Sequence, residues 1–223
     1  GWSVTIMMSD LAAFYRARGE GIAMPAPLDR QYKDFAYWQA HAFSGQTEHP
    51  ALAFWRKRLV NGSVESAIPT DFQRPADRAG QGAMVRQVLG TAASADLRRA
   101  ATDAGTTLFA TFTALLHALL HLRSGAAATM IGAADAGRDQ LEVEDQVGFY
   151  LNLMAFGLSA DPTAPLSSWI AAATEEAAAV FEHKAYPFDL VLEALELSAK
   201  PGHSPVFDIL LLLQNNATPT GRF

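Results

Sequence analysis

Three observations on the sequence predict an α/β fold, a two-layer sandwich of helices and a sheet. Strand-like apolar runs alternate with helical patterns from residue 83 onward, whereas the first 60 residues show helical spacing alone. Half of the 223 residues are hydrophobic, which is enough to bury a core. Between these parts, an Asn-Gly pair and two prolines interrupt the pattern. We therefore expect a helical part at 1–60, a connector at 61–82 and an α/β part at 83–223.

The first part predicts three helices. The first begins at Trp2 and ends at Arg18-Gly19, because its apolar residues recur at roughly helical spacing. Residues 18–30 carry two Gly and two Pro without an apolar period, which indicates a connecting segment. The second and third helices are predicted at 29–43 and 50–60 by their apolar stripes.

The second part alternates strands and helices. Ser94 is a plausible N-cap for a helix that Gly105 ends, and Pro165 opens another helix at a position where its missing N–H costs nothing. The run 149–158 is almost wholly apolar, as in a strand covered on both faces. The other predicted elements are strand 84–89, helix 106–123, strand 127–134, helix 189–197 and strand 206–213.

Composition and charge exclude several functions. The net charge of −6 disfavours nucleic-acid binding, which needs concentrated Lys and Arg. The lack of cysteine removes disulfides, thiolate metal sites and a Cys nucleophile. The most apolar run, 209–213, is far shorter than the ~20 residues of a membrane-spanning helix, and the first residues lack the basic region of a signal peptide. We expect a cytoplasmic location and neither a membrane nor a nucleic acid as partner.

No set of His, Asp or Glu residues in the sequence forms a complete metal-binding motif. His117 and His121 stand four apart on one helix, as in zinc proteases, but Ala118 replaces the Glu that those enzymes need. We interpret both as histidines at a helix boundary. The acidic residues at 142–145 are interpreted as a solvated loop. No metal site is predicted.

Three segments concentrate aromatic and polar side chains at the edges of predicted elements. They are 32–39 (YKDFAYWQ), 137–152, which opens with Gly-Arg and closes with VGFYLN, and 183–189 (HKAYPFD). Asn152 stands inside an apolar strand, where a buried amide must find hydrogen-bond partners. Two interpretations stay open: Asn152 pairs with the backbone and fixes the sheet, which the residues alone favour, or it lines a channel through the core.

Five collinear segments resemble the condensation domains of nonribosomal peptide synthetases. Residues 32–39 are similar to that family's Y-x-D-[FY]-A-x-W-Q motif and 147–152 to its [IV]-G-x-F-V-N motif, with Gly137-Arg138 at the usual place upstream. Residues 183–189 resemble the [HN]-Q-D-Y-P-F-[ED] motif. The other two are Pro69-Thr70-Asp71 before Arg74-Pro75, and Ser204-Pro205-Val206-Phe207 before an apolar run ending Gln214-Asn215.

The chain departs from the family pattern in places. Lys184-Ala185 replace Gln-Asp, Tyr150-Leu151 replace Phe-Val, and His203 stands where the family has an Arg-rich stretch. The catalytic signature of the family is H-H-x-x-x-D-G, usually followed by W-S. This chain begins Gly1-Trp2-Ser3, so we expect Gly1 to be the remnant of that signature, with the histidines and the Asp before it and no catalytic residue in 1–223.

The resemblance implies a fold and a reaction. It implies the chloramphenicol acetyltransferase-like sandwich in a V-shaped pair of subdomains, of which 83–223 forms most of the C-terminal one. It implies a tunnel into which donor and acceptor peptidyl carrier proteins thread phosphopantetheine arms, next to an adenylation domain. The acceptor amine attacks the donor thioester and forms an amide, with no permanently bound cofactor. The basic run 56–58 is then either an exposed helix face or a carrier docking patch.

The resemblance also implies roles for individual residues. Gly148 would permit close chain approach beside the tunnel or would simply be a glycine at a strand start. Asn152 would orient groups on the tunnel wall. Trp38 would wall the tunnel or simply pack. Arg138 would anchor a loop, contact the pantetheine arm or form an ordinary surface salt bridge. Residues implied to be structural are Tyr32, Asp34, Tyr186, Pro187 and Phe188, of which the last three fix a helix start.

Two other function classes stay open. The same superfamily includes epimerisation, heterocyclising and ester-forming relatives that share the fold. A catalytically silent domain that recruits partner proteins is the third class. The residues before Gly1 would discriminate between these classes, because function belongs to the site rather than to the fold.

Overall fold

The computed structural model describes residues 2–43, 45–46, 48–60, 68–72, 74–75, 80, 82–159, 161 and 163–214. The chain divides into two units. The first unit consists of Gly1–Gln46, Asp135–Asn152 and Gln214–Phe223, and the second of Thr47–Ala134 and Leu153–Leu213. Gly1 lies outside the described residues, as do 61–67 of the expected connector. The division at 61–82 stays a prediction.

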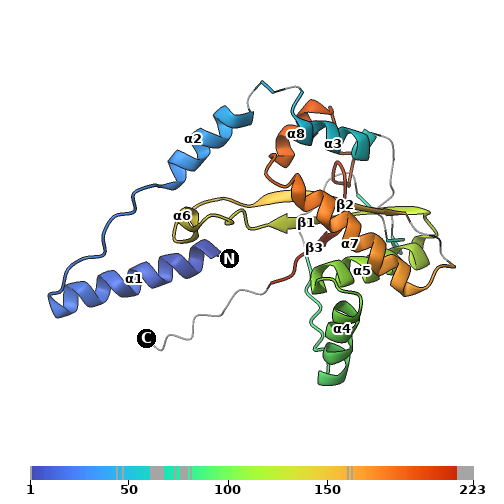
Figure 1. The fold of residues 1–223 in the computed structure, drawn as a ribbon, viewed down its shortest axis with the longest axis horizontal. Helices are drawn as coiled ribbons and strands as arrows, with labels where there is room; N and C mark the ends of the chain where they lie inside the picture. Colours follow the sequence, from blue (N-terminus) through green and yellow to red (C-terminus); the bar gives the residue numbers. More distant parts are fainter. Residues whose placement is uncertain are drawn as a thin grey trace. The chain divides into compact units, whose positions relative to one another are not determined.

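The first unit contains helices α1 (Trp2–Glu20), α2 (Tyr32–Phe43) and α6 (Leu141–Glu144), labelled in Figure 1. The helix predicted from Trp2 is α1 and extends to Glu20. Helix α2 begins three residues later than predicted. The Asp34 carboxylate accepts the backbone N–H of Gln31 at 2.8 Å, as in a capping box, and this contact fixes the helix start.

Helix α6 corrects the interpretation of residues 142–145 as a solvated loop. The segment forms one helical turn in which Val143 is buried, while the acidic side chains are exposed to solvent as expected. Glu142 and Glu144 lie in the first turn, where negative charge complements the helix dipole. The Gln146 amide donates to the Glu142 carbonyl oxygen at 2.7 Å and closes the turn.

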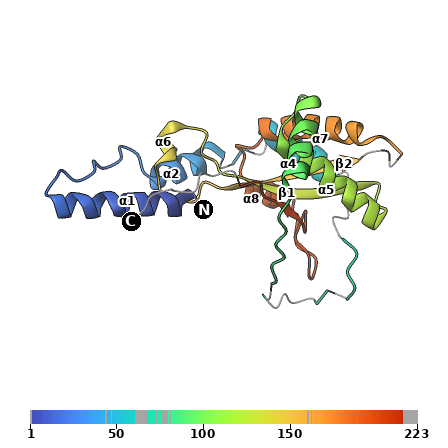
Figure 2. The same ribbon diagram turned by 90° about the horizontal axis from the view of Figure 1, so that it is seen from below.

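The second unit is an α/β sandwich, as the sequence predicts. Its sheet has the strand order β2-β1-β3, and β1 runs parallel to β3 with Gly132 opposite Leu210. Helices α5 and α7 pack on each other, and both views show them beside β1 and β2 (Figure 1 and Figure 2). The elements are α3 (Pro50–Val60), α4 (Thr91–Asp103), α5 (Leu108–Ser124), β1 (Ala128–Asp135), β2 (Asn152–Ser159), α7 (Leu166–Glu182), α8 (Phe188–Ala194) and β3 (Leu210–Leu211).

The core of the second unit joins these two helices to the sheet. Phe109 of α5 contacts Phe156 of β2, with ring centroids 5.3 Å apart. One buried cluster consists of Ala114, Leu158, Trp169, Ile170 and Ala173. This cluster places the middle of α7 in the core. Toward the ends of α7, Leu166 and Phe181 are partly exposed.

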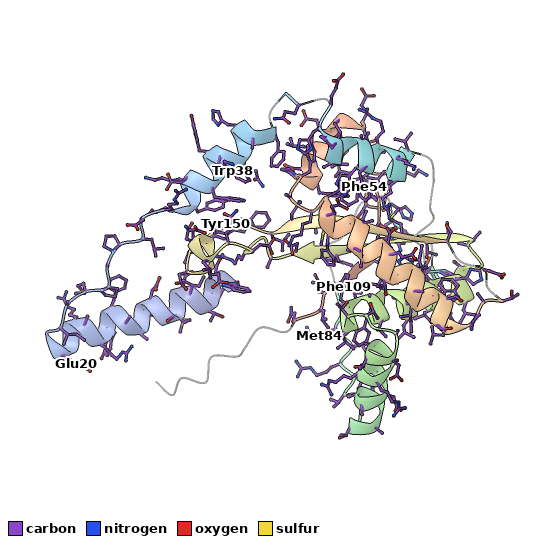
Figure 3. The ribbon with its side chains drawn as sticks, viewed as in Figure 1. Glu20, Trp38, Phe54, Met84, Phe109 and Tyr150 are labelled. Atoms are coloured by element: carbon purple, nitrogen blue, oxygen red, sulfur yellow. The ribbon has the colours of Figure 1, made fainter. Side chains whose placement is uncertain are left out.

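The strand predicted at 84–89 is wrong. Met84, Val85 and Val88 are 85%, 94% and 81% exposed, and 82–90 forms no strand (Met84 is labelled in Figure 3). A strand needs a neighbour to satisfy its backbone groups. In the described part of the chain, the sheet ends at β3 and β2, and neither pairs with this segment.

Two other strands are shorter than predicted. The strand expected at 149–158 begins at Asn152 and ends at Ser159. Just before the expected start, the Gly148 N–H donates to Ser3 Oγ and not to a neighbouring strand. The strand expected at 206–213 shrinks to Leu210–Leu211. Just before it, the Asp208 carboxylate accepts the Ser204 N–H at 2.8 Å, and such local side-chain hydrogen bonds compete with strand pairing.

Helix starts differ by a few residues from the predictions. Helix α4 begins at Thr91, and its N-cap is Gly90 instead of the predicted Ser94. Ser94 lies inside the helix, where its backbone N–H donates to the Gly90 carbonyl oxygen at 3.0 Å. Gly105 does follow the end of α4, with φ at +60°. Helix α5 is capped by Thr107, whose hydroxyl accepts the Ala110 N–H at 3.1 Å. Helix α8 runs over Phe188–Ala194 rather than 189–197.

No single helix among the described residues is long and apolar enough to cross a membrane. Helices α4 and α5 are long and apolar enough for a span only when they are taken together, and the two helices are bent by 105° relative to each other.

Candidate functional site

The side chain of Arg138 collects residues from three segments of the first unit. We call Ser3, Tyr32, Arg138, Gly148 and Tyr150 the Arg138 cluster. The guanidinium is buried, with 7% of the residue exposed, and its Nη2 lies 3.2 Å from Ser3 Oγ and 3.4 Å from the Gly148 carbonyl oxygen. These contacts join the start of α1 to the segment 138–148.

Arg138 also holds the turn of α6. Its Nη1 donates to the Val143 carbonyl oxygen and lies 3.5 Å from that of Glu144. The charge rests 4.4 Å from the Tyr150 ring centroid and 5.8 Å from that of Trp2. Burial lowers the pKa of Arg138, partly offset by Tyr150, yet a guanidinium stays protonated. These are the contacts of a loop anchor, whereas contact with a pantetheine arm stays a prediction.

Ser3 is central to the cluster, although the sequence did not single it out. Its hydroxyl donates to the Gly148 carbonyl oxygen at 2.9 Å and accepts the Gly148 N–H at 3.2 Å, besides the contact with Arg138. The neighbouring Trp2 indole N–H donates to the Glu144 carbonyl oxygen at 3.1 Å. The only sequence signal was that Trp2-Ser3 continues the family signature.

Gly148 is in close contact with two tyrosines. A Cβ at this position would lie 2.4 Å from Tyr32 Cδ2 and 2.8 Å from Tyr150 Cε2, which no side chain tolerates without displacement. The small residue therefore lets the backbone approach the rings while both its N–H and its carbonyl bind Ser3.

Tyr150 packs against α2. Its ring centroid lies 5.2 Å from that of Tyr32 in an edge arrangement and 4.7 Å from that of Phe35. The phenol donates to Gln146 Oε1. Burial raises the pKa of Tyr150, with Arg138 opposing this shift, so the hydroxyl keeps its proton at neutral pH. Tyr150 and Tyr32 thus tie the motif on α2 to the motif that follows α6.

Trp38 lies in the middle of α2, and Asn152 lies at the start of β2. Trp38, labelled with Tyr150 in Figure 3, contacts Phe35 and Phe43 with ring centroids 5.8 Å and 6.1 Å apart. It is still 52% exposed, so packing within the first unit covers only half of it. Asn152 is half buried and opens β2 instead of standing inside the strand. Whether either residue faces a tunnel stays a prediction.

The third motif segment lies in the second unit. Pro187 is the N-cap of α8, and its carbonyl oxygen accepts the Val191 N–H at 3.2 Å. Tyr186 and Phe188 are buried, with ring centroids 5.1 Å from His49 and 5.9 Å from Trp55. These residues shape the start of a helix.

His183, which opens the same motif segment, lies flat on Phe54 of α3. The two ring planes are 1° apart and their centroids 3.9 Å apart. Its Nδ1 lies 2.9 Å from the Ala179 carbonyl oxygen. Arg58 covers the same phenylalanine ring at 4.6 Å. These contacts hold α3 against the end of α7.

Two polar core residues were missed or misread from the sequence. His117 is fully buried, so its interpretation as a boundary histidine is wrong, and burial lowers its pKa to about 4. Glu176 of α7 accepts the Gly157 N–H at 2.8 Å and pairs with Arg58. Arg58 is therefore engaged within the second unit.

Within the described ranges, no group of three or more acidic, histidine or cysteine side chains is placed to hold a metal ion.

The sequence matches a known family and several peptide synthetases. Residues 1–220 match the family model described as condensation domain. The chain is 32% identical over 221 residues to malpinin synthetase of Mortierella alpina, covering 97% of this chain and 3% of that protein. It is 31% identical over 215 residues to gramicidin S synthase 2 of Brevibacillus brevis, covering 96% and 5%.

Solved structures share the fold. The X-domain from teicoplanin biosynthesis matches with a TM-score of 0.85 and 25% identity, over 94% of this chain and 48% of that one. A four-domain nonribosomal peptide synthetase bound to AMP and glycine matches with a TM-score of 0.83 and 22% identity, over 96% and 16%. The chain thus spans about half of a solved domain of this fold and a few per cent of the synthetases.

Proposed function

This chain belongs to the condensation-domain family of nonribosomal peptide synthetases, and we propose that it is part of a domain that forms amide bonds between carrier-bound substrates. In the proposed reaction, a carrier-bound aminoacyl amine attacks a carrier-bound acyl or peptidyl thioester. The C–N bond forms, the C–S bond breaks, and the amine proton ends on the released thiol of the donor arm.

The Arg138 cluster is the observation that carries this proposal. Three segments that resemble family motifs, at the start of α1, on α2 and at 138–150, meet in the first unit around one buried cation. Amide formation by a neutral amine depends mainly on holding amine and carbonyl together, and on donors for the developing oxyanion. A fixed frame beside the reacting groups serves that need. The cluster supplies such a frame, while the proton-transfer group belongs to the signature expected before Gly1.

The partners follow from the same proposal. Donor and acceptor peptidyl carrier proteins deliver the phosphopantetheine arms, and an adenylation domain loads the acceptor. The arms are parts of the substrates. We also propose that the protein works in the cytoplasm.

The first measurement is the sequence of the residues directly before Gly1, from the coding DNA or from mass spectrometry of the intact protein. Two histidines, three residues and an Asp support an amide-forming catalyst. Replacement of either histidine contradicts it. The functional test then uses the complete module with both carriers loaded and mass spectrometry of the acceptor arm. A new amide on the acceptor supports the proposal, and unchanged acceptor in a folded, fully loaded module refutes it.

A second candidate is a domain that recruits a partner without forming bonds. The observation in its favour is the match to the X-domain from teicoplanin biosynthesis, a domain that has also been solved in complex with OxyB. Absence of amide together with specific capture of a further protein of the same pathway would favour this candidate.

A further inference from the structure

We propose that Ser3 is a positioning residue: its hydroxyl locks the start of α1, and with it the chain directly before Trp2, onto Gly148 and Arg138. The catalytic meaning of this lock rests on the proposed function, which places the reacting histidines just upstream of Trp2. The family signature usually continues with Trp-Ser at this position, but the resemblance implies no role for the Ser3 side chain.

The Ser3 hydroxyl uses its full hydrogen-bonding capacity within the cluster. A hydroxyl offers one donor and two acceptor lone pairs. Ser3 Oγ donates to the Gly148 carbonyl oxygen at 2.9 Å, and it lies 3.2 Å from both the Gly148 N and Arg138 Nη2, which donate to it. Such a three-way contact defines the position of one atom far better than a single hydrogen bond does.

This use of Ser3 differs from the usual use of serine at a helix start. A serine there normally caps its own helix by accepting an N–H two or three residues ahead. Ser3 instead binds a residue 145 positions away. Trp2 does the same, because its indole donates to the Glu144 carbonyl oxygen at 3.1 Å. Both side chains at the start of α1 are therefore committed to the segment 144–148.

The partners of Ser3 are themselves fixed. The ring of Tyr32 fills the space beside the Gly148 Cα, since a Cβ there would lie 2.4 Å from Tyr32 Cδ2. Arg138 is buried and also bound to carbonyl oxygens of α6. A hydroxyl bound to two closely packed groups ties its own backbone to their position. On the proposed function, the reacting histidines directly precede Trp2, so the same contacts would set their position.

The test is a set of three variants in the complete domain with loaded carriers. Ser3→Ala removes the hydroxyl, Ser3→Thr restores it, and Ser9→Ala is the matched control on an exposed position of the same helix. We expect Ser3→Ala to lower kcat about 10- to 100-fold, because a displacement of ~1 Å has effects of this size. KM for the carriers should stay unchanged, since the Ser3 hydroxyl is engaged with Gly148 and Arg138. Ser3→Thr should recover most of kcat, and Ser9→Ala should match the wild type.

A second readout separates positioning from folding and from the proposed function. Hydrogen exchange of the Gly148 amide should accelerate in Ser3→Ala, while the amides of α5 and α7 keep wild-type protection. Equal kcat in Ser3→Ala and Ser9→Ala, or a kcat loss that merely follows the loss of folded protein, overturns the inference. Unchanged protection of Gly148 also overturns it. A wild-type domain that makes no amide overturns the proposed function instead, while the exchange experiment still decides whether Ser3 locks the start of α1.

Discussion

His117 of α5 and Thr129 of β1 share a buried hydrogen bond, with Nδ1 and Oγ1 2.6 Å apart. The other ring nitrogen, Nε2, is buried and has no partner among the residues that the structure describes. A protonated ring would place a charge and a second N–H in this apolar core. Burial therefore keeps His117 neutral and lowers its pKa from 6.5 to about 4.

The first prediction is a loss of stability at acid pH caused by His117. In the unfolded chain the histidine binds its proton near pH 6.5, whereas in the folded protein it does so only near pH 4. The folded state thus binds fewer protons in this window, and stability falls as the pH drops from 6.5 toward 4. At about 1.4 kcal/mol per pH unit, the loss approaches 3 kcal/mol. Urea unfolding of the complete domain at several pH values measures it.

His117→Leu removes the titrating ring and should flatten this part of the pH profile. His121→Leu is the matched control, one turn further along α5, where the ring is only half buried and binds the Ala126 carbonyl oxygen. The profile of His121→Leu should keep the wild-type slope. A slope that persists in His117→Leu would show that other groups cause the acid sensitivity.

The second prediction concerns the pair of Arg58 and Glu176, which joins α3 to α7. Arg58 Nε lies 3.2 Å from Glu176 Oε1, and the same oxygen accepts the Gly157 N–H of β2 at 2.8 Å. Removing the cation leaves a nearly buried carboxylate uncompensated, which typically costs about 3–5 kcal/mol. Because Arg58 is partly exposed, we expect Arg58→Met to lie at the lower end of that range in urea unfolding.

Glu176→Gln tests the cause of that loss. The amide oxygen can still accept the Gly157 N–H but carries no charge that needs Arg58. The double variant Arg58→Met/Glu176→Gln should therefore be more stable than Arg58→Met alone. Glu175→Ala, at the exposed neighbouring position, serves as the control and should leave stability nearly unchanged. Strictly additive losses in the double variant would contradict this account.

Helices were more predictable from this sequence than strands, for a physical reason. A helix satisfies its backbone within one segment, so local sequence signals such as Pro165 sufficed to predict α5 and α7. A strand needs a partner from elsewhere in the chain. The apolar runs at 84–89 and 206–213 look equally strand-like, yet only Leu210–Leu211 pairs, next to β1.

The site was predictable only as far as its motifs reach. Arg138, Gly148 and Tyr32 were singled out by resemblance, and the structure brings them together in the first unit. Ser3 and His117 carry no local pattern that announces their contacts, because their partners lie at distant sequence positions or on another element. Hydrogen bonds of this kind depend on the tertiary structure, which propensity and spacing do not encode.

The third prediction is that Gly148 tolerates no side chain. A methyl group would collide with the rings of Tyr32 and Tyr150, and overpacking of this kind costs about 1–3 kcal/mol. Gly148→Ala should lower the melting temperature and move the Ser3 contacts, and so reduce condensation as well. Gly82→Ala is the control, because nothing lies within 4 Å of its Cβ position. Wild-type stability and activity in Gly148→Ala would contradict the crowded geometry.

The fourth prediction separates the two interpretations of Asn152. The residue opens β2, where a purely structural amide and a tunnel-wall amide would look alike. If Asn152 orients substrate groups, Asn152→Ala in the complete domain should slow condensation about tenfold or more, a small displacement being enough. The melting temperature should fall by no more than about 4 °C, the shift that the loss of ~1 kcal/mol causes in a domain of about 150–250 residues, and a larger complete domain should shift less. Ser159→Ala, at the exposed far end of the same strand, is the control. A loss of activity that only parallels the loss of folded protein would make Asn152 a structural residue of the sheet.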